Sequence, residues 1–99
     1  MNIVNKAITV MGHARAKGGH EDAAREVLNG FVEPARSEEG CLRYELFEDL
    51  YYVGSFYTVE EWASEQALET HVKVQKPEMN KLLPLLSAEV RISIVKALT

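Results

Sequence analysis

The hydrophobic positions of this chain repeat with two different periods, which alternate in a fixed order. Four segments alternate apolar and polar residues, as strands with one buried face do, at about 6–15, 41–49, 56–62 and 88–97. Apolar residues at helical spacing follow the first segment and the third. The order strand, helix, strand, strand, helix, strand predicts a ferredoxin-like α+β fold with a four-stranded antiparallel sheet.

Turn and capping residues indicate where these elements begin and end. Gly18 and Gly19 end the first strand, and Gly40 is the expected left-handed stop of the first helix. Ser64 offers a side-chain oxygen that caps the next helix. Because proline suits a first helical turn, a separate, shorter helix is expected to start near Pro77.

The alternation assigns one face of the sheet to the helices. Leu42, Tyr44 and Leu46 share that face of the second strand, and Val90, Ile92 and Ile94 share it on the last. The opposite face mixes charged or polar residues with apolar ones: His13, Arg15, Glu45, Tyr57, Glu61 and Arg91 beside Met11, Phe47, Val59 and Val95. Such a mixture fits a second copy of the chain better than bulk water, so a homodimer is expected.

Length and composition indicate one domain over residues 1–99. Eleven basic and 15 acidic residues give a net charge of −4, which disfavours nucleic acid or an anionic membrane as partner. The single Cys41 rules out an internal disulfide and a cysteine-based zinc site, and a small buried residue is favoured there over a reactive thiol. Three histidines without paired spacing argue against a metal site. Without a long apolar run, a soluble, cytoplasmic protein is expected.

One stretch places chemically useful side chains close together. Phe56, Glu60 and Trp62 share a face of the third strand. On the helix that follows, Leu68 and His71 fall on one side. A carboxylate, an indole and an imidazole therefore lie on adjoining elements, which predicts a pocket.

These residues belong to a longer pattern that closely resembles the antibiotic biosynthesis monooxygenase family. The resemblance covers nearly the whole chain and rests on residues 17–19, 34–46, Asp49, 56–64 and 67–71. It implies a dimeric α+β barrel, in which two ferredoxin-like sheets pack face to face. It also implies oxidation of quinols or polyphenols by molecular oxygen without metal, flavin or haem, whereas a close branch rearranges a small phosphorylated sugar.

The chain departs from the family pattern at one point. The family often carries a second histidine, in a Thr-Pro-His pattern a few residues after the first. Here the stretch reads Gln75-Lys76-Pro77-Glu78-Met79, with Glu78 where that histidine falls. A mechanism that needs two imidazoles is therefore not expected.

The resemblance suggests a role for each candidate residue. A cofactor-free oxygenase needs a base beside a phenol, and histidine titrates nearest neutral pH, so His71 is the candidate base. The alternative is a core histidine bonded to a backbone carbonyl. Glu60 either orients His71 or forms an ion pair at the sheet edge.

The remaining candidates would bind the substrate or pack the core. Trp62, Phe56 and Leu68 are the expected walls for an aromatic ring, although an indole is more often a core residue. Tyr44 brings its hydroxyl to the same layer, and Asn5 precedes the first strand, where family members place a polar group near the pocket.

Three functions follow from these residues. The first is a cofactor-independent monooxygenase acting on a small quinol-like or polyphenolic substrate. The second is an isomerase acting on a carbonyl sugar, for which Arg36, Arg43 and Lys81 are the available phosphate-binding cations. The third is a dimeric binding module without catalysis. Haem degradation is not expected, because no histidine follows His71.

Overall fold

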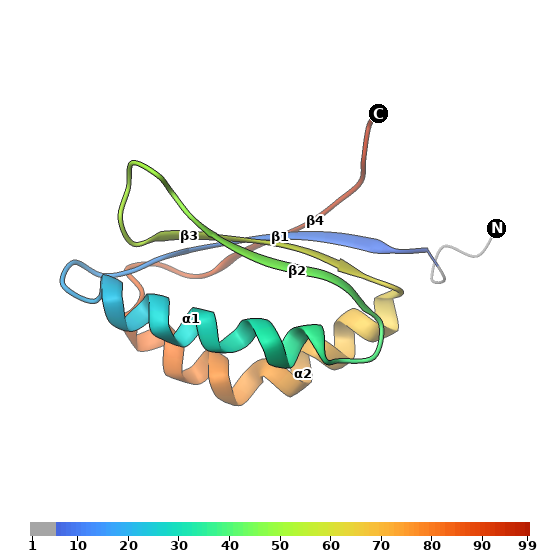
Figure 1. The fold of residues 1–99 in the computed structure, drawn as a ribbon, viewed down its shortest axis with the longest axis horizontal. Helices are drawn as coiled ribbons and strands as arrows, with labels where there is room; N and C mark the ends of the chain where they lie inside the picture. Colours follow the sequence, from blue (N-terminus) through green and yellow to red (C-terminus); the bar gives the residue numbers. More distant parts are fainter. Residues whose placement is uncertain (1–5) are drawn as a thin grey trace.

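Two long helices lie on one face of a four-stranded antiparallel sheet (Figure 1). The computed structural model describes residues 6–99. Its elements are β1 (Ile8–Arg15), α1 (Glu21–Arg36), β2 (Cys41–Glu48), β3 (Ser55–Trp62), α2 (Glu65–Leu82), the short 3-10 helix η2 (Leu83–Leu85) and β4 (Arg91–Val95). The strands are ordered β2-β3-β1-β4. This arrangement confirms the predicted ferredoxin-like α+β fold.

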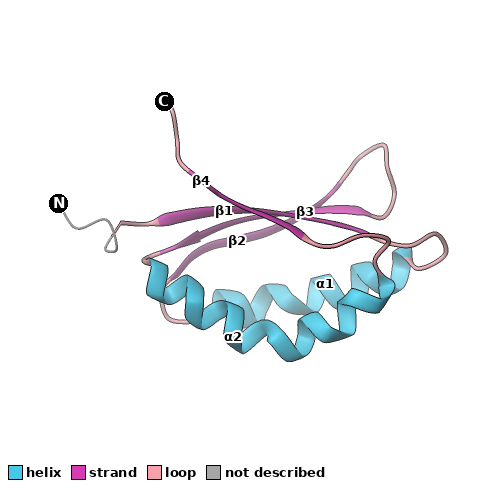
Figure 2. Ribbon diagram, turned by 180° about the vertical axis from the view of Figure 1, so that it is seen from behind, coloured by secondary structure: helices cyan, strands magenta, loops and turns pink. Residues whose placement is uncertain are grey.

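The opposite face of the sheet carries no helix. Seen from behind, α1 and α2 both lie below the sheet, and the strands are open above (Figure 2). Three large side chains of that face are partly exposed: Met11, Phe47 and Tyr57. Within residues 6–99, neither helix is long and apolar enough to cross a membrane.

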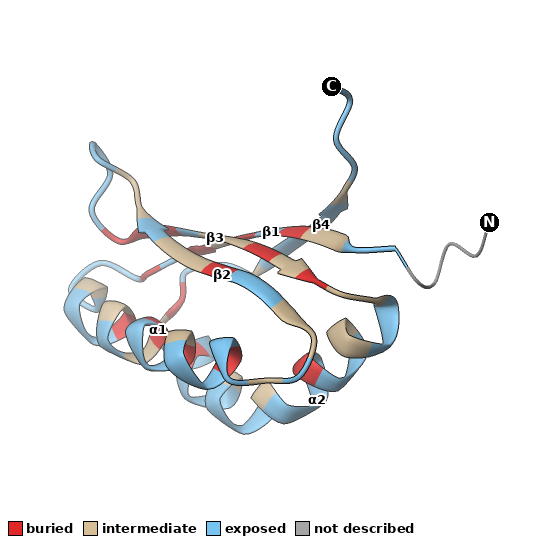
Figure 3. Ribbon diagram, turned by 45° about the vertical axis from the view of Figure 1, so that its right-hand side comes forward, coloured by how far each residue is buried: buried red, intermediate tan, exposed pale blue. Residues whose placement is uncertain are grey.

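The core fills the layer between the helices and the sheet (Figure 3). Alternation sends Val10 and Ala14 of β1 and Phe56 and Trp62 of β3 toward the helices, where all four are buried. The helices add residues at helical spacing: Ala24, Leu28, Phe31 and Ala35 from α1, and Leu82 from α2.

A single helix runs through Pro77, so the expectation of a separate, shorter helix there was wrong. Proline removes one backbone hydrogen bond from a helix interior. However, a stripe of Leu68, His71, Gln75, Met79 and Leu82 continues at spacings of three and four residues across the proline. Packing of this whole stripe under the sheet holds both halves in one helix, capped as predicted by the Ser64 hydroxyl, 3.1 Å from the Ala67 amide.

Two predicted core strands depart from strict alternation or full burial. A β-bulge between Cys41 and Arg43 leaves Leu42 exposed, because the extra residue shifts it out of register. On β4, Ile92 pairs with Gly12 and Ile94 with Val10, so both face the helix side as predicted. They are nevertheless 58% and 65% exposed, because β4 is the edge strand.

An ion pair fastens α1 to the hairpin that joins β2 and β3. The Arg25 guanidinium donates to both oxygens of Glu48, at 2.7 and 2.8 Å. The Gly54 amide donates to the same carboxylate at 2.9 Å. The Arg25 contact, and after it the Gly54 amide, lowers the pKa of Glu48 from 4.5 to about 2.

Replacing this carboxylate should change how stability depends on pH. A lowered folded-state pKa stabilises the fold above the unfolded value, and the contribution is lost as pH falls through the folded value. We therefore expect Glu48→Gln to be less stable than wild type above pH 4.5, with the difference closing toward pH 2. Urea unfolding across this range measures the effect.

The control is Glu26→Gln, which removes an exposed carboxylate from α1, the helix that carries Arg25. Its stability curve should run parallel to that of wild type. A constant gap between wild type and Glu48→Gln from about pH 6 to about pH 2 would contradict the assignment.

Candidate active site

A buried carboxylate, Glu60, lies at the centre of the site. It is 5% exposed and points from β3 toward the helices. The Trp62 indole N–H donates to its Oε1 at 3.0 Å, and the Thr58 hydroxyl donates to its Oε2 at 2.8 Å. Residues two apart on a strand share a face, so local sequence alone brings these three side chains together. Each oxygen of Glu60 thus accepts one hydrogen bond.

His71 of α2 lies directly behind Glu60. Its ring is 3% exposed and stacks on Trp62, with ring centroids 4.2 Å apart and planes inclined by 30°. Nε2 lies 3.8 Å from Glu60 Oε1, and Nδ1 lies 2.8 Å from Glu38 Oε2. The alternative of a core histidine is right about the burial of His71 but wrong about its partner, because the ring bonds a carboxylate rather than a backbone carbonyl.

Glu38 comes from the connection between α1 and β2 and was not among the residues predicted from the sequence. That connection packs closely on α2: Gly40 has φ +87°, and a Cβ there would lie 2.7 Å from the Ala67 Cβ. The Ala63 amide also donates to the Gly40 carbonyl at 2.7 Å. No spacing pattern links position 38 to position 71, because the contact exists only once the connection between α1 and β2 has packed onto α2.

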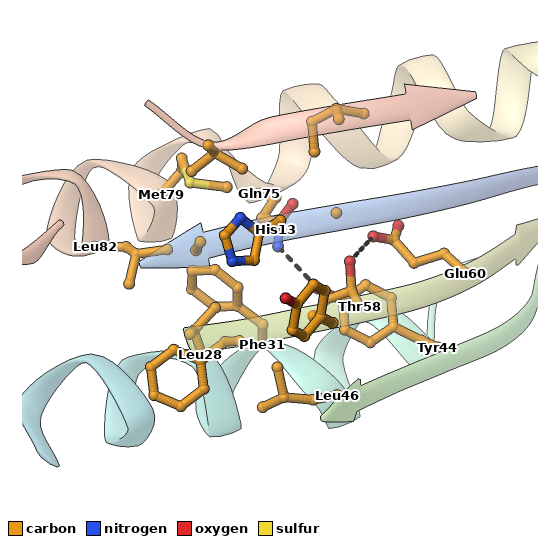
Figure 4. Close-up of a pocket in the computed structure, with 16 residues that line it drawn as sticks. His13, Leu28, Phe31, Tyr44, Leu46, Thr58, Glu60, Gln75, Met79 and Leu82 are labelled. Carbon is orange, nitrogen blue, oxygen red and sulfur yellow. Dashed lines mark hydrogen bonds between the residues drawn. The ribbon is translucent and has the colours of Figure 1, made fainter. Parts of the chain in front are cut away.

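A cavity of about 50 Å³ opens beside Glu60. Figure 4 shows Thr58, Glu60 and Tyr44 from the sheet and Gln75 from α2 converging on it. The rest of its lining is mostly apolar: Leu28, Phe31, Leu46, Phe56, Met79, Leu82, Val90 and Ile92.

The arrangement differs from the expected one, in which His71 and Trp62 wall the hollow. Neither residue lines the cavity. Nδ1 of His71 is turned to Glu38 and its ring face is covered by the indole, so the carboxylate of Glu60 reaches the cavity in place of the imidazole.

Tyr44 supplies a neutral hydroxyl to the same cavity. Burial, and after it the nearby Glu60 charge, raises the pKa of this phenol, so it keeps its proton at neutral pH. The Gln75 amide donates to the Tyr44 oxygen at 3.4 Å. Gln75 was not among the predicted site residues, although its place one turn after His71 on the buried stripe of α2 was a usable signal.

The other predicted residues fall at different distances from the cavity. Phe56 lines it, whereas Leu68 packs against the core without reaching the wall. Asn5 lies outside the described residues. His13, expected on the far face, bonds the Ser55 hydroxyl at 2.8 Å and also borders the cavity.

The thiol of Cys41 does not have the surroundings of a reactive cysteine. Cys41 is half-buried, and burial raises the pKa of its thiol, so the thiol stays protonated at neutral pH. Over residues 6–99, no group of three or more histidine, cysteine, aspartate or glutamate side chains is arranged to hold a metal ion.

The family model of the antibiotic biosynthesis monooxygenases matches residues 7–78, which include β1, α1, β2, β3 and most of α2. The chain belongs to this family. The matched residues include Glu38, Glu60, Trp62 and His71, so these four site residues lie within the part of the chain that the family model covers.

Solved structures share the family fold over almost their whole length. Rv0793 from Mycobacterium tuberculosis superposes with a TM-score of 0.87 at 23% identity, covering 95% of this chain and 97% of its own. PA3566 from Pseudomonas aeruginosa gives a TM-score of 0.82 at 29% identity, covering 99% and 100%. The uncharacterized protein sll1783 of Synechocystis sp. is 34% identical over 64 residues, 65% of this chain. The matched segment spans 44% of the length of that relative.

Gly12 makes room for the hydroxyl that holds Glu60. A Cβ at this position would lie 2.6 Å from Thr58 Oγ1 and 3.5 Å from Ile92 Cδ1. We therefore expect Gly12→Ala to displace Thr58 and to lower the free energy of unfolding by about 1–3 kcal/mol, the usual cost of overpacking. Urea unfolding measures this loss.

Gly18→Ala is the matched control, since a Cβ there meets nothing within 4 Å. It should stay within about 0.5 kcal/mol of wild type. Equal stability of the two variants would show that the strand contact at Gly12 is not tight.

Proposed function

We propose that this chain is a cofactor-independent monooxygenase that oxidises a small quinol-like or polyphenolic substrate with molecular oxygen. The observation that carries the proposal is a buried carboxylate, Glu60, at the wall of a mostly apolar cavity and backed by an imidazole. Membership of the monooxygenase family supports the reaction class. The site residues support the chemistry, since ring ionisation needs a base in a place sheltered from water.

In the proposed reaction, Glu60 takes the proton of a ring hydroxyl. The resulting phenolate is electron-rich enough to transfer one electron to oxygen. The ring radical and superoxide then combine to form a carbon–oxygen bond. The stored proton goes to the peroxide, a ring C–H proton is removed as the O–O bond breaks, and the products are a quinone and water. A phenol with one free ring C–H thus supplies both hydrogens of the water, and no further reductant is required.

Tyr44 has a distinct part in this scheme. Because its pKa is raised, it acts as a hydrogen-bond donor rather than a base, and a phenolate or peroxide oxygen is a suitable acceptor. Phe56 supplies an aromatic wall. Trp62 and His71 do not form walls of the cavity; Trp62 donates a hydrogen bond to Glu60, and His71 lies beside Glu60 on the side away from the cavity. Leu68 packs in the core and does not form a wall either.

The size of the cavity limits how substrate enters. About 50 Å³ holds one or two waters, whereas ligand sites typically enclose about 300–1,000 Å³. A ring must therefore displace side chains at the border. Met79 is unbranched and flexible, and Ile92 is 58% exposed on the edge strand, so these two side chains can give way.

The isomerase alternative receives less support from the same geometry. A phosphorylated sugar needs cations at the cavity, yet Arg36, Arg43 and Lys81 do not line it. Each cation pairs instead with a carboxylate on its own element: Glu33, Glu45 and Glu78 in turn.

Loss of the carboxylate tests the proposed base. We expect Glu60→Gln to slow oxygen uptake with a hydroxynaphthalene by about 10²–10⁴-fold, because glutamine keeps the shape but cannot take a proton. An oxygen electrode, read above the autoxidation background, measures the rate.

Glu61→Gln is the control, since this neighbour points to the opposite face of the sheet and should retain the wild-type rate. An unchanged rate in Glu60→Gln would exclude this residue as the base. Tight binding of the naphthol with no oxygen uptake by wild type would favour the non-catalytic binding module.

We propose further that two copies of the chain pair through the open face of the sheet. Met11, Phe47 and Tyr57 are 50%, 45% and 41% exposed there, on a face that no helix covers. Large apolar side chains gathered on one face are typical of an interface. The family resemblance, which implies face-to-face sheets, points to the same surface.

A charge on this face should separate the two copies. We expect wild type to sediment with twice the mass of one chain and Phe47→Glu to sediment as a monomer, because the interface would bury an unpaired carboxylate. Val72→Glu places the same charge at an exposed position of α2 and should remain dimeric. A monomeric wild type at high protein concentration would refute the proposal.

A further inference from the structure

We infer that Glu38 is a positioning residue, which holds the proton of His71 on Nδ1 so that Nε2 receives the substrate proton from Glu60. The inference rests on the proposed function, in which Glu60 is the base and His71 lies behind it, and adds Glu38 as the residue that orients His71. Neither the sequence pattern nor the family match assigns a role to this residue.

The contact with Glu38 selects the tautomer of His71. Nδ1 lies 2.8 Å from a carboxylate oxygen of Glu38, which can only accept a hydrogen bond when ionised. The proton of this bond therefore sits on the ring nitrogen. When the ring is neutral, Nε2 carries no proton, and its lone pair lies 3.8 Å from Glu60 Oε1.

Nε2 of His71 offers a substrate proton a second acceptor behind Glu60. Both oxygens of Glu60 already accept hydrogen bonds, from Trp62 and Thr58. Nε2 of His71 has no donor among residues 6–99, and a shift of about 1 Å brings it within hydrogen-bond distance of Glu60. A proton collected by Glu60 at the cavity can thus pass to Nε2, which frees the carboxylate to act again.

Two carboxyl groups, those of Glu38 and Glu60, lie at the two ring nitrogens of His71. A proton on Nε2 makes an imidazolium between two carboxylates, so each positive nitrogen edge faces a negative oxygen. Such a pairing stabilises a buried cation that would otherwise be costly. The proton can therefore be kept while oxygen reacts, and then returned to the peroxide through Glu60.

Other ionisable side chains lie near His71 and its two carboxylate partners. Tyr44 of β2 lies with its ring centroid 5.8 Å away and keeps its proton. The Cys41 thiol of β2 lies close enough to feel the charges of Glu38, Glu60 and Arg36. Arg36 donates to the Tyr44 carbonyl at 2.9 Å rather than to Glu38.

One atom of Glu38 supports a role beyond packing. Its Oε1 is buried and has no hydrogen-bond partner within residues 6–99, while Oε2 bonds His71. A carboxylate kept in this costly position for packing alone would be replaced at a gain in stability by a neutral side chain. Interaction with a ring that gains positive charge explains why a carboxyl side chain occupies this position.

The test compares Glu38→Gln with Glu39→Gln, which removes an exposed carboxylate from the next position of the same connection. Nitrogen-15 NMR of the histidine rings, with His71→Gln to assign the signal, reports the tautomer without any turnover. We expect the Nδ1–H form in wild type and Glu39→Gln. In Glu38→Gln the amide can either accept from Nδ1–H or donate to Nδ1, so an Nε2–H form should appear beside the Nδ1–H form, and Glu38→Asp should restore Nδ1–H alone.

A second measurement follows the proton directly. A hydroxynaphthalene bound without oxygen should show the absorption of its anion in wild type and Glu39→Gln. In Glu38→Gln we expect that band to fall, since Nε2 is occupied in the Nε2–H form. Circular dichroism checks that each variant is folded.

The two measurements separate the possible failures. An anion band of equal strength in Glu38→Gln, or an unchanged Nδ1–H tautomer there, overturns the role of Glu38 and leaves the proposed function standing. If wild type binds the naphthol without ionising it, the proposed function fails, and the role of Glu38 in catalysis fails with it.

Discussion

The hydrogen-bonded burial of one carboxylate is the constraint on which the rest of this structure depends. Glu60 is 5% exposed, and a charge at that depth is tolerated only with partners in place. The strand supplies two of them at alternate positions, Thr58 and Trp62, and the missing side chain of Gly12 leaves space for the first. The helix supplies His71. The contacts that make the burial of Glu60 tolerable in the fold are therefore also the contacts that build the candidate site.

Charged side chains at the two ends of the sheet have different roles, stability at one end and the proposed chemistry at the other. At the end near the β2–β3 hairpin, Arg25 and Glu48 join α1 to the sheet through a partly exposed, bidentate ion pair. At the end where β3 passes into α2, the charges are buried and their partners are aromatic or neutral. The contribution of the Arg25–Glu48 ion pair to stability does not change with pH near neutrality, because the lowered pKa of Glu48 keeps its carboxyl group ionised there. The other end places a proton acceptor beside a cavity, where a change of protonation has a chemical consequence.

Much of the fold was predictable because it follows from short-range periodicity. Alternation at Glu60 and Trp62 and helical spacing at His71 assigned the carboxylate, the indole and the imidazole to neighbouring elements, and the structure brings them together. Local signals failed where longer-range packing outweighs them. The buried stripe of α2 continues through Pro77, and a bulge turns Leu42 outward. Glu38 was out of reach for the same reason, since 33 positions separate it from the ring it bonds.

The stacking of Trp62 on His71 has a practical consequence. This is the single tryptophan of the chain, so all indole fluorescence comes from the site itself. Its ring lies 4.2 Å from the imidazole, so we expect a change of charge on that imidazole to alter the indole emission. The protein therefore carries an intrinsic optical reporter of the charge state at its own centre, readable in solution without a label or a substrate.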